Sequence, residues 1–512
     1  MSNDQASLQR IASLTRLDRS VNLTILFLLV VAPVFAVFVD LFSPALGGYA
    51  DQRFFLCGVI IMMTFFGAAV YFSSGRIFEL LVKSWSLVLF SLSFVFLSVP
   101  FSASEFVWIE PGFYALFFLS VAIVGRFLAD SFMIDRSATA FLIVIGLVCF
   151  FYGMMTINVY LFAIVDGVER LREYIPWGFV NIRYWSHVAT WLLPLLPAAA
   201  MAVSLRKHRL WRLIIFTGAG LWWWILFLSS ARGTAVSVAF GAICVLILFG
   251  KHGRAWLKSL SSHIALGVAF WLLLSLLIPS LLIDASTEVS FNVDSSGRMP
   301  LFQEAWRMSE ENFPFGMGPQ SWLTHEIFTE AYKSSPKFGH PHNIYLMWAA
   351  EYGWILLVVL VGVFLQVSKR LVVTRKKLFY ANGAASNLVI PFTASVAAAS
   401  LHAGVSAVLI APASMLVGLP VLIIFWALIE PSAGQKSQSL VIKTRGFHKS
   451  LVAAAVTALL LLCLVWFGQV VSYHQAMVED EAFYHDKISD GMNPRFWFHG
   501  NFPRAPDSNA PR

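Results

Sequence analysis

Residues 339–354 read GHPHNIYLMWAAEYGW and combine the two features that decide the fold of this chain. A polar His-Pro-His-Asn run leads directly into a tryptophan-rich apolar span, and it follows the longest polar loop between two such spans. Apolar spans of roughly 17 to 25 residues, each long enough to cross a bilayer as a helix, recur along the sequence. An imidazole at this position therefore indicates chemistry at a membrane surface.

The composition excludes a soluble protein. Of the 512 residues, 58% are hydrophobic and only 12% are charged, and the mean hydropathy is +0.73. A water-exposed surface could not be built from so few polar groups. The sequence predicts an all-α integral membrane protein, a polytopic bundle of about twelve to thirteen transmembrane helices. The expected spans are 21–43, 54–72, 78–100, 112–129, 137–157, 186–205, 210–229, 233–250, 259–283, 344–367, 387–407, 409–429 and 451–472.

The basic residues of the short loops set the expected orientation, because Lys and Arg collect on the cytoplasmic side. With an alternating count of spans, every basic cluster falls on one side, and the loops after odd-numbered spans face outward. The net charge of +8 is thus explained by topology, and its scattered distribution argues against nucleic-acid binding. The clusters are Arg10, Arg16 and Arg19; Arg76; Arg136; Arg206, Lys207, Arg209 and Arg212; Lys251 and Arg254; Lys369, Arg370, Arg375, Lys376 and Lys377; and Lys436, Lys443, Arg445 and Lys449.

The chain divides into five expected segments. The long polar loops lie only on the outward side, where we therefore expect the functional site. The final stretch of the chain is expected to be disordered, and the four cysteines lie in apolar spans as core residues. The segments are a cytoplasmic N-terminus (1–20), a first transmembrane group (21–283), a large outward loop (284–343), a second transmembrane group (344–472) and a polar C-terminal tail (473–512).

The large outward loop has internal structure of its own. Residues 299–311 place their apolar side chains near one helical face, which predicts a helix lying on the membrane or the bundle. A Pro and Gly cluster in PFGMGPQSW (314–322) predicts a turn, and a second short helix is expected over 320–332.

Four outward features could carry chemistry: Arg183, Arg232, Arg298 and the His340–His342 run. Guanidiniums on one membrane face suit a polyanion, because their planar forks bind phosphate oxygens and stay charged. A neutral imidazole nearby can take a proton from a hydroxyl. This combination suits attack by a hydroxyl on a carbon whose leaving group is a diphosphate. No outward Asp-x-Asp pair argues for a metal, and no cofactor is expected.

Simpler interpretations exist for each of these residues. An arginine near a helix end usually extends its charge to the lipid headgroups. His340 is favoured as an ordinary loop residue, and Asn343 could cap the helix that begins at Ile344. Glu351 is either a group that supports the site or a buried acid paired with an arginine. From spacing alone, the prediction reaches an outer-face enzyme or a transporter.

Four stretches together resemble the superfamily of O-antigen ligases and Wzy-type polymerases. HPHNIYLMWAAEYGWILL (340–357) resembles its signature, in which a His-Asn pair opens a transmembrane helix containing Glu-x-Gly. SSARGTAVSVAFG (229–241) resembles its Ser-Arg-Gly turn, and residues 296–322 resemble its Gly-Arg, Trp and Pro-x-x-Gly-x-Gly-Pro loop. FVNIRYWSHVATWLLPLLP (179–197) resembles its Asn-x-Arg/Asn segment. The resemblance covers about 178–367 in family order; the first five spans match only in topology.

The resemblance implies a GT-C-like, metal-independent glycosyltransferase with its large loop and active face on the periplasmic side of the bacterial inner membrane. The donor would be a glycan on undecaprenyl diphosphate, and the acceptor a sugar hydroxyl on lipid A core or a similar glycan. Arg232 and Arg298 would bind the diphosphate with help from Arg183, and His342 would be the general base. Other polysaccharide-assembly membrane proteins would be partners, within a lipid environment.

The chain departs from the family pattern in three places, and other functions stay open. Ala231 stands where a Ser is frequent, Pro341 precedes the key histidine, and a final span with an outward tail is additional to the usual twelve. A Wzy-type polymerase or a protein-acceptor oligosaccharyltransferase would carry the same motifs. A solute transporter would instead need charged or interrupted helices at mid-membrane, for which Lys83, His402, Pro412 and Pro420 are the candidates.

Overall fold

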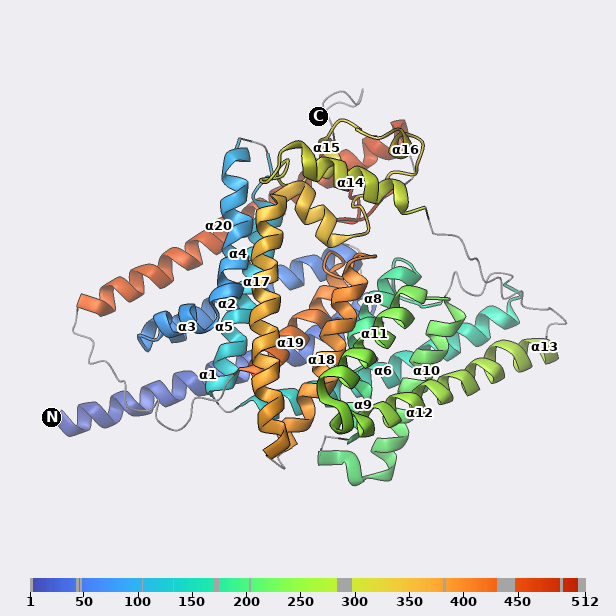
Figure 1. Cartoon of the computed structure of the whole chain (residues 1–512), viewed down its shortest axis with the longest axis horizontal. Coiled ribbons are helices and arrows are strands. Elements are labelled where there is room, and N and C mark those ends of the chain that lie inside the picture. Colours follow the sequence, from blue (N-terminus) through green and yellow to red (C-terminus); the bar gives the residue numbers. More distant parts are fainter. Residues whose placement is uncertain are drawn as a thin grey trace.

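The computed structural model is built from helices, and no strand occurs among the residues it describes (Figure 1). Parts of three predicted regions lie outside the described residues: the start of the outward loop, the basic segment around Lys436 to Arg445, and the end of the tail. The described residues are 3–42, 46, 48–103, 105–131, 133–168, 175–201, 204–282, 297–380, 384–430, 447–488 and 491–504.

Most helices coincide with the predicted apolar spans. Short 3-10 and π segments join some of them. The helices are α1 (Asn3–Phe42), α2 (Gly48–Ser73), α3 (Ile77–Lys83), α4 (Trp85–Ser98), α5 (Ile109–Asp130), α6 (Ile134–Val165), α8 (Ile182–Leu192), α9 (Leu196–Met201), α10 (Arg209–Leu228), α11 (Arg232–Phe249), α12 (Arg254–Phe270), α13 (Ile278–Leu282), α14 (Met299–Glu311), α15 (Ser321–Thr324), α16 (Glu330–Lys333), α17 (Ile344–Tyr380), α18 (Ala384–Ala403), α19 (Pro412–Ile429) and α20 (Phe447–Lys487).

Among the described residues, fewer separate candidate spans are found than the twelve to thirteen expected. In the described part of the chain, nine helices are long and apolar enough to cross a membrane, or ten when α3 and α4, bent by 93°, form one span. Two expected spans, 233–250 and 259–283, fall on one stretch of 50 residues, Arg232–Leu281. The expected span 186–205 is divided between α8 and α9, where Pro194 cannot continue the helical hydrogen bonds. The expected span 387–407 yields only the short apolar helix Leu388–Ala403.

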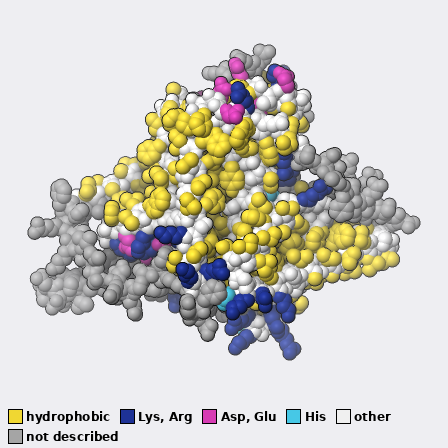
Figure 2. Space-filling view, viewed as in Figure 1, with side chains coloured by type: hydrophobic (Ala, Val, Ile, Leu, Met, Phe, Trp, Pro, Cys, Tyr) yellow, Lys and Arg dark blue, Asp and Glu magenta, His cyan; other side chains and the backbone are white. Residues whose placement is uncertain are grey.

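Helix α19 lies at the centre of the bundle. It is apolar around its whole circumference, which is the pattern of a fully enclosed helix, and it packs against α1, α2, α5, α8 and α18. Figure 2 shows the consequence for the surface: apolar side chains cover much of the described part of this face, and many of its Lys and Arg side chains lie near the lower end. The chain is therefore a multi-pass membrane protein.

Helices α14, α15 and α16 form a cap over one end of the bundle, above α17 (Figure 1). We refer to this end as the capped end. Glu304 of α14 is fully buried and organises the cap, because it accepts hydrogen bonds from Nε2 of His325 at 2.9 Å and from the backbone N–H of Phe328 and Thr329 at 2.7 and 2.9 Å. The amphipathic helix expected over 299–311 is confirmed as α14, while the second helix expected over 320–332 is wrong in extent, since only α15 and α16 form there.

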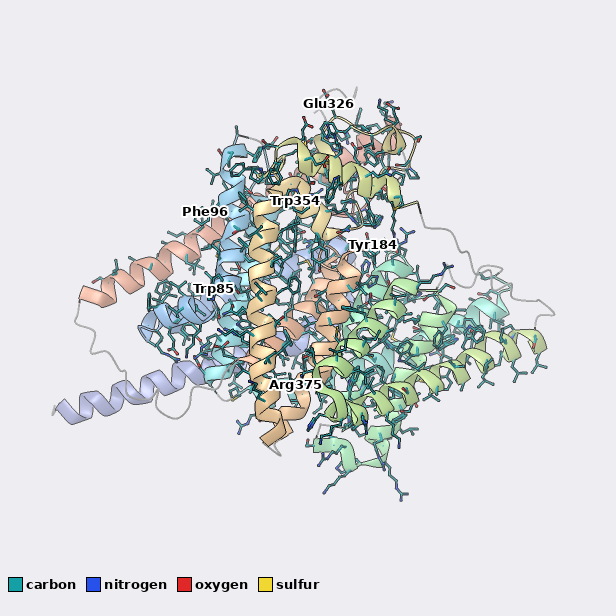
Figure 3. All side chains as sticks on the ribbon, viewed as in Figure 1. Trp85, Phe96, Tyr184, Glu326, Trp354 and Arg375 are labelled. Carbon is teal, nitrogen blue, oxygen red and sulfur yellow. The ribbon has the colours of Figure 1, made fainter. Side chains whose placement is uncertain are left out.

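The cap is joined to α17 at a break in that helix. Gly353 has a φ of +82°, and a Cβ there would lie 2.1 Å from the carbonyl oxygen of Pro314. The turn after Pro314 fills the break: the N–H of Met317 donates to the carbonyl of Ala350 at 2.8 Å, and that of Gly318 to the carbonyl of Glu351 at 2.9 Å. The cap thus supplies N–H donors to two carbonyls that have no partner within the broken helix. Figure 3 shows Trp354 directly beneath the cap.

Candidate functional site

His342 lies in the loop that enters α17 at the capped end. Its backbone is left-handed, with a φ of +57°, a conformation that costs energy for a residue with a side chain. The side chain is only 7% exposed and packs edge-on against the rings of His340 and Phe338, with centroids 4.4 and 4.9 Å away. Neither ring nitrogen of His342 has a hydrogen-bond partner among the described residues. Such a buried imidazole is available to a ligand.

His340 holds this loop in shape. Its Nδ1 accepts a hydrogen bond from the backbone N–H of His342 at 3.1 Å, so in the neutral ring the proton is on Nε2. Burial, followed by the neighbouring His342 and Arg495, keeps the pKa of His340 well below its usual value. The uncharged ring of His340 therefore stabilises the strained backbone of His342. His340 thus has a structural role in this loop, whereas the sequence favoured an ordinary loop residue.

Asn343 caps α17. Its Oδ1 accepts hydrogen bonds from the N–H groups of Tyr345 and Leu346 at 3.0 and 3.1 Å. The capping interpretation is confirmed, because these are the N–H groups that a helix start leaves without backbone partners. Asn343 thus supports the site by fixing where the helix after His342 begins.

Arg183 and Arg298 lie close enough to His342 to act on it electrostatically. Burial and then the charges of these two guanidiniums lower the pKa of His342 to about 3. Burial and the charge of Arg183 also lower the pKa of Arg298. Arg183 is exposed in the first turn of α8, and Arg298 is half-buried at the start of α14. Two mutually repelling cations beside an uncharged imidazole form a site that an anion would stabilise.

Arg232 is the first residue of α11, a helix that packs against α8 and α18. The turn before it is tight: Ser230 has a φ of +50°, and the N–H of Arg232 donates to the carbonyl of Ser230 at 2.8 Å. A Cβ on the next residue, Gly233, would lie 2.7 Å from Nε2 of His402. The charge of Arg298 also acts on His402, so the start of α11 lies near the other arginines, and the Arg232 side chain is exposed.

Buried hydrogen bonds join the helix ends beneath the site. Oγ1 of Thr190 and Nδ1 of His402 are 2.7 Å apart, and Thr234 donates from Oγ1 to the carbonyl of Ser186 at 2.8 Å. These contacts tie α8, α11 and α18 together. His402 therefore has a structural partner in the bundle, and Lys83, another residue considered for transport, forms an ion pair with Glu79 at 2.6 Å.

A buried arginine from the C-terminal segment reaches the same end of the bundle. Arg495 donates from Nε and Nη2 to the two carboxylate oxygens of Glu110 at 2.7 and 2.8 Å, and from Nη2 to Glu351 at 2.8 Å. Its Nη1 donates to the carbonyl of Gly339 at 3.2 Å, immediately before His340. Glu351 is 0% exposed, so the alternative of a buried acid paired with an arginine is confirmed. Arg495 connects α5, α17 and the histidine loop.

The segment that carries Arg495 is itself anchored at the capped end. The hydroxyl of Tyr49 donates to the carbonyl of Arg495 at 2.6 Å, and Nε of Arg53 donates to the carbonyl of Phe496 at 2.9 Å. The Arg53 guanidinium also lies over the rings of Phe113 and Phe496, 4.9 and 4.7 Å from their centroids. Residues 491–504 are thus packed into the protein, although this segment was expected to belong to a polar tail.

A comparison with protein families supports what these residues suggest. Residues 217–361 match the family model described as O-antigen ligase (Wzy_C), and the match includes Arg232, Arg298 and the histidine loop. This match, over less than a third of the chain, supports a relationship to the O-antigen ligase and Wzy superfamily, whose members are glycosyltransferase-like enzymes. Comparisons with curated proteins and with solved structures gave no match.

The structure brings together most residues singled out from the sequence. His340, His342, Arg183 and Arg298 share one electrostatic environment at the capped end, and Arg232 begins a helix that packs there. Arg495 and Glu110 were missed. The available signal for Glu110 was an acid at the edge of an apolar span, which needs a partner; nothing near Arg495 in the sequence marks it as that partner.

Proposed function

We propose that this chain is an O-antigen ligase-like glycosyltransferase at the periplasmic face of the bacterial inner membrane. It would transfer a preassembled glycan from undecaprenyl diphosphate to a sugar hydroxyl, on lipid A core or a similar acceptor. The observation that carries the proposal is His342: a buried imidazole whose two nitrogens have no hydrogen-bond partner among the described residues, close to two guanidiniums that act on it electrostatically. The matched family model supports the reaction class.

The chemistry follows from these groups. The acceptor oxygen attacks the anomeric carbon while a nitrogen of His342 takes the hydroxyl proton. The bond between that carbon and the diphosphate oxygen breaks, and its electron pair leaves with the diphosphate. Arg183, Arg298 and Arg232 stabilise the charge that develops on the leaving group. A single displacement of this kind inverts the anomeric configuration, and no step requires a metal.

The arginines also regulate the basicity of His342. In the free protein the pKa of His342 is about 3 because of burial and two adjacent cations, so the imidazole is neutral but a weak base. A bound diphosphate neutralises the guanidiniums and removes their share of the shift. The pKa of His342 then rises toward the range in which an imidazole accepts a proton effectively. The base would become effective only when the donor is in place.

A substitution tests the role of His342. We expect His342→Ala to insert into the membrane normally and to lose glycan transfer, measured with the chain in vesicles containing a lipid-linked donor. His208→Ala is a matched control, because His208 is exposed before α10 and lies outside the site. Transfer at the normal rate by His342→Ala would overturn the assignment of the base.

The acceptor distinguishes a ligase from a polymerase, since both fit the family and the site. Deletion of the chromosomal gene followed by analysis of surface glycan separates them. Unmodified lipid A core with lipid-linked polymer accumulating supports the ligase. Single repeats still attached to core would instead assign the chain as a polymerase with the same catalytic groups.

A further inference from the structure

A cavity lies at the capped end, outside the His342 site. It has a volume of about 900 Å³, within the range of roughly 300–1,000 Å³ that is typical of small-molecule sites. Its walls come from the end of α1, the start of α2, the segment leading into α8, the start of α19, α20 and the C-terminal segment. All of its lining residues therefore lie outside the family match at residues 217–361.

One side of the cavity is aromatic. The ring of Tyr49 stands edge-on to Tyr184, with centroids 5.9 Å apart, and lies 6.1 Å from the ring of Phe498. Tyr49 and Tyr184 are buried, and Tyr49 is fixed by its hydrogen bond to the C-terminal segment. Rigid aromatic rings of this kind offer flat apolar faces to a ligand that also has polar edges, such as a sugar ring.

The cavity lining also contains acidic side chains. Asp40 from α1 and Glu479 and Glu481 from α20 line the cavity, and none of the described lining residues is Lys or Arg. Carboxylates form strong hydrogen bonds with hydroxyl and ammonium groups and repel phosphate.

The cavity and the His342 site share a wall. Tyr184 lines the cavity, while Arg183, the preceding residue of α8, acts on His342. Figure 3 shows Tyr184 below the cap, where α8 begins. Two adjoining sites therefore have opposite electrostatic character: one is cationic and suited to a diphosphate, and the other is acidic and aromatic.

We propose that this cavity binds the acceptor glycan through uncharged or amine-bearing sugar residues, with their rings on Tyr49 and Tyr184 and their hydroxyl or amino groups on the carboxylates. This inference rests on the proposed transferase function. The expected acceptor is a sugar without phosphate groups. Three carboxylates line the cavity, no described lining residue is Lys or Arg, and these carboxylates would repel an anionic ligand. The donor diphosphate is confined by charge to the arginines on the other side of α8.

Binding of defined tetrasaccharides to the full chain in nanodiscs tests the proposal independently of transfer. The probes are maltotetraose, which is neutral, a chitosan tetramer, which carries amines, and tetragalacturonate, which is anionic. We expect the chitosan tetramer to bind best and tetragalacturonate to bind at least roughly ten-fold more weakly than maltotetraose. The double substitution Glu479→Gln with Glu481→Gln should remove the preference for the amine-bearing probe.

Two comparisons make the outcome decisive. His342→Ala should bind the tetrasaccharides normally while losing transfer. If the unmodified chain binds the tetrasaccharides but transfers no glycan from a lipid-linked donor, the transferase is contradicted and the glycan cavity still stands. Three results would each overturn the cavity assignment. Tetragalacturonate could bind as tightly as maltotetraose, no probe could bind, or the double variant could bind all probes with unchanged affinities. Both Glu479 and Glu481 are at least partly exposed on α20, so their conversion to Gln should leave folding intact.

Discussion

Two buried arginines, Arg126 and Arg495, lie in carboxylate networks at opposite ends of the bundle. Arg126, in α5, donates to Glu430 at 2.7 Å and to Glu79 at 3.1 Å, and Glu430 is shared with Arg370. Arg495 donates to Glu110 and Glu351. Both side chains are about 1% exposed, so the two networks have similar chemistry and burial.

Their surroundings differ. The network of Arg126 joins the ends of transmembrane helices and contacts no residue of the proposed site. The network of Arg495 also includes the carbonyl of Gly339, from which the histidine loop continues. The same arrangement thus ties helix ends together at one end and additionally holds the histidine loop of the proposed site at the other. Substitutions that remove one arginine at a time separate these two roles.

The largest effect is expected for Arg495→Ala. It leaves two buried carboxylates without their cation and should destabilise the protein by about 3–5 kcal/mol. Because the histidine loop also loses its hydrogen bond at Gly339, transfer per folded molecule should fall as well. Thermal unfolding in detergent and transfer normalised to folded protein measure the two quantities. Normal transfer per folded molecule would reduce Arg495 to a purely structural role.

Arg126→Ala is the matched substitution at the other end. Glu430 keeps Arg370 as a partner, so the expected destabilisation is smaller, about 1.5–3 kcal/mol, as for charged hydrogen bonds. Transfer per folded molecule should equal that of the unmodified protein. A loss of transfer comparable to that of Arg495→Ala would show that the two ends are not functionally distinct.

The pH dependence of transfer should show the effect of the charges of Arg183 and Arg298 on His342. The pKa of His342 in the free protein is about 3, and donor binding raises it, so kcat should decline at a higher pH than kcat/KM as acid is added. The lowered pKa also means that stability present above about pH 6.5 is lost as the pH falls toward 3, because the unfolded imidazole binds the proton first. Folded protein must therefore be measured at each pH. In Arg183→Gln, the falls of kcat and of kcat/KM at low pH should lie closer together. If these two falls already coincide in the unmodified protein, the proposal that donor binding raises the pKa of His342 is contradicted.

The smallest effect is expected for Asn343→Ala. Loss of the cap on α17 should cost about 1 kcal/mol of stability, with a modest decrease in transfer. Neither arginine network is touched, so this variant gives the cost of a local defect beside His342. Asn343→Asp should restore most of the stability because its carboxylate also accepts from the first-turn N–H groups. Complete loss of transfer in Asn343→Ala would assign Asn343 a direct role.

The sequence predicts the helices well because each apolar span must form its backbone hydrogen bonds internally. It predicts their connections less well. The break at Gly353 was visible only as a glycine within an apolar run, and its meaning depends on Pro314, about forty residues earlier, filling the gap. The division at Pro194 and the bend between α3 and α4 likewise arise from local backbone geometry that average hydropathy does not record.

The site was predictable to the extent that its residues share a motif or a membrane face. The histidine and arginine motifs are local in sequence, and alternating topology places them at one end. The Arg495 network could not be predicted, because Glu110 and Glu351 precede it by 385 and 144 residues. Burial of Glu351 indicated that an arginine was needed, but only packing identifies which of many arginines supplies it.

The position of Arg495 has a consequence for biosynthesis. Glu110, the histidine loop and Glu351 are all translated before α20, which must enter the membrane to bring residues 491–504 to the capped end. Until then, two carboxylates remain in an apolar bundle without their cation. The proposed active site is therefore complete only after Arg495 has been synthesised and α20 has entered the membrane, so that a chain stopped before Arg495 would lack the cation that Glu110 and Glu351 share.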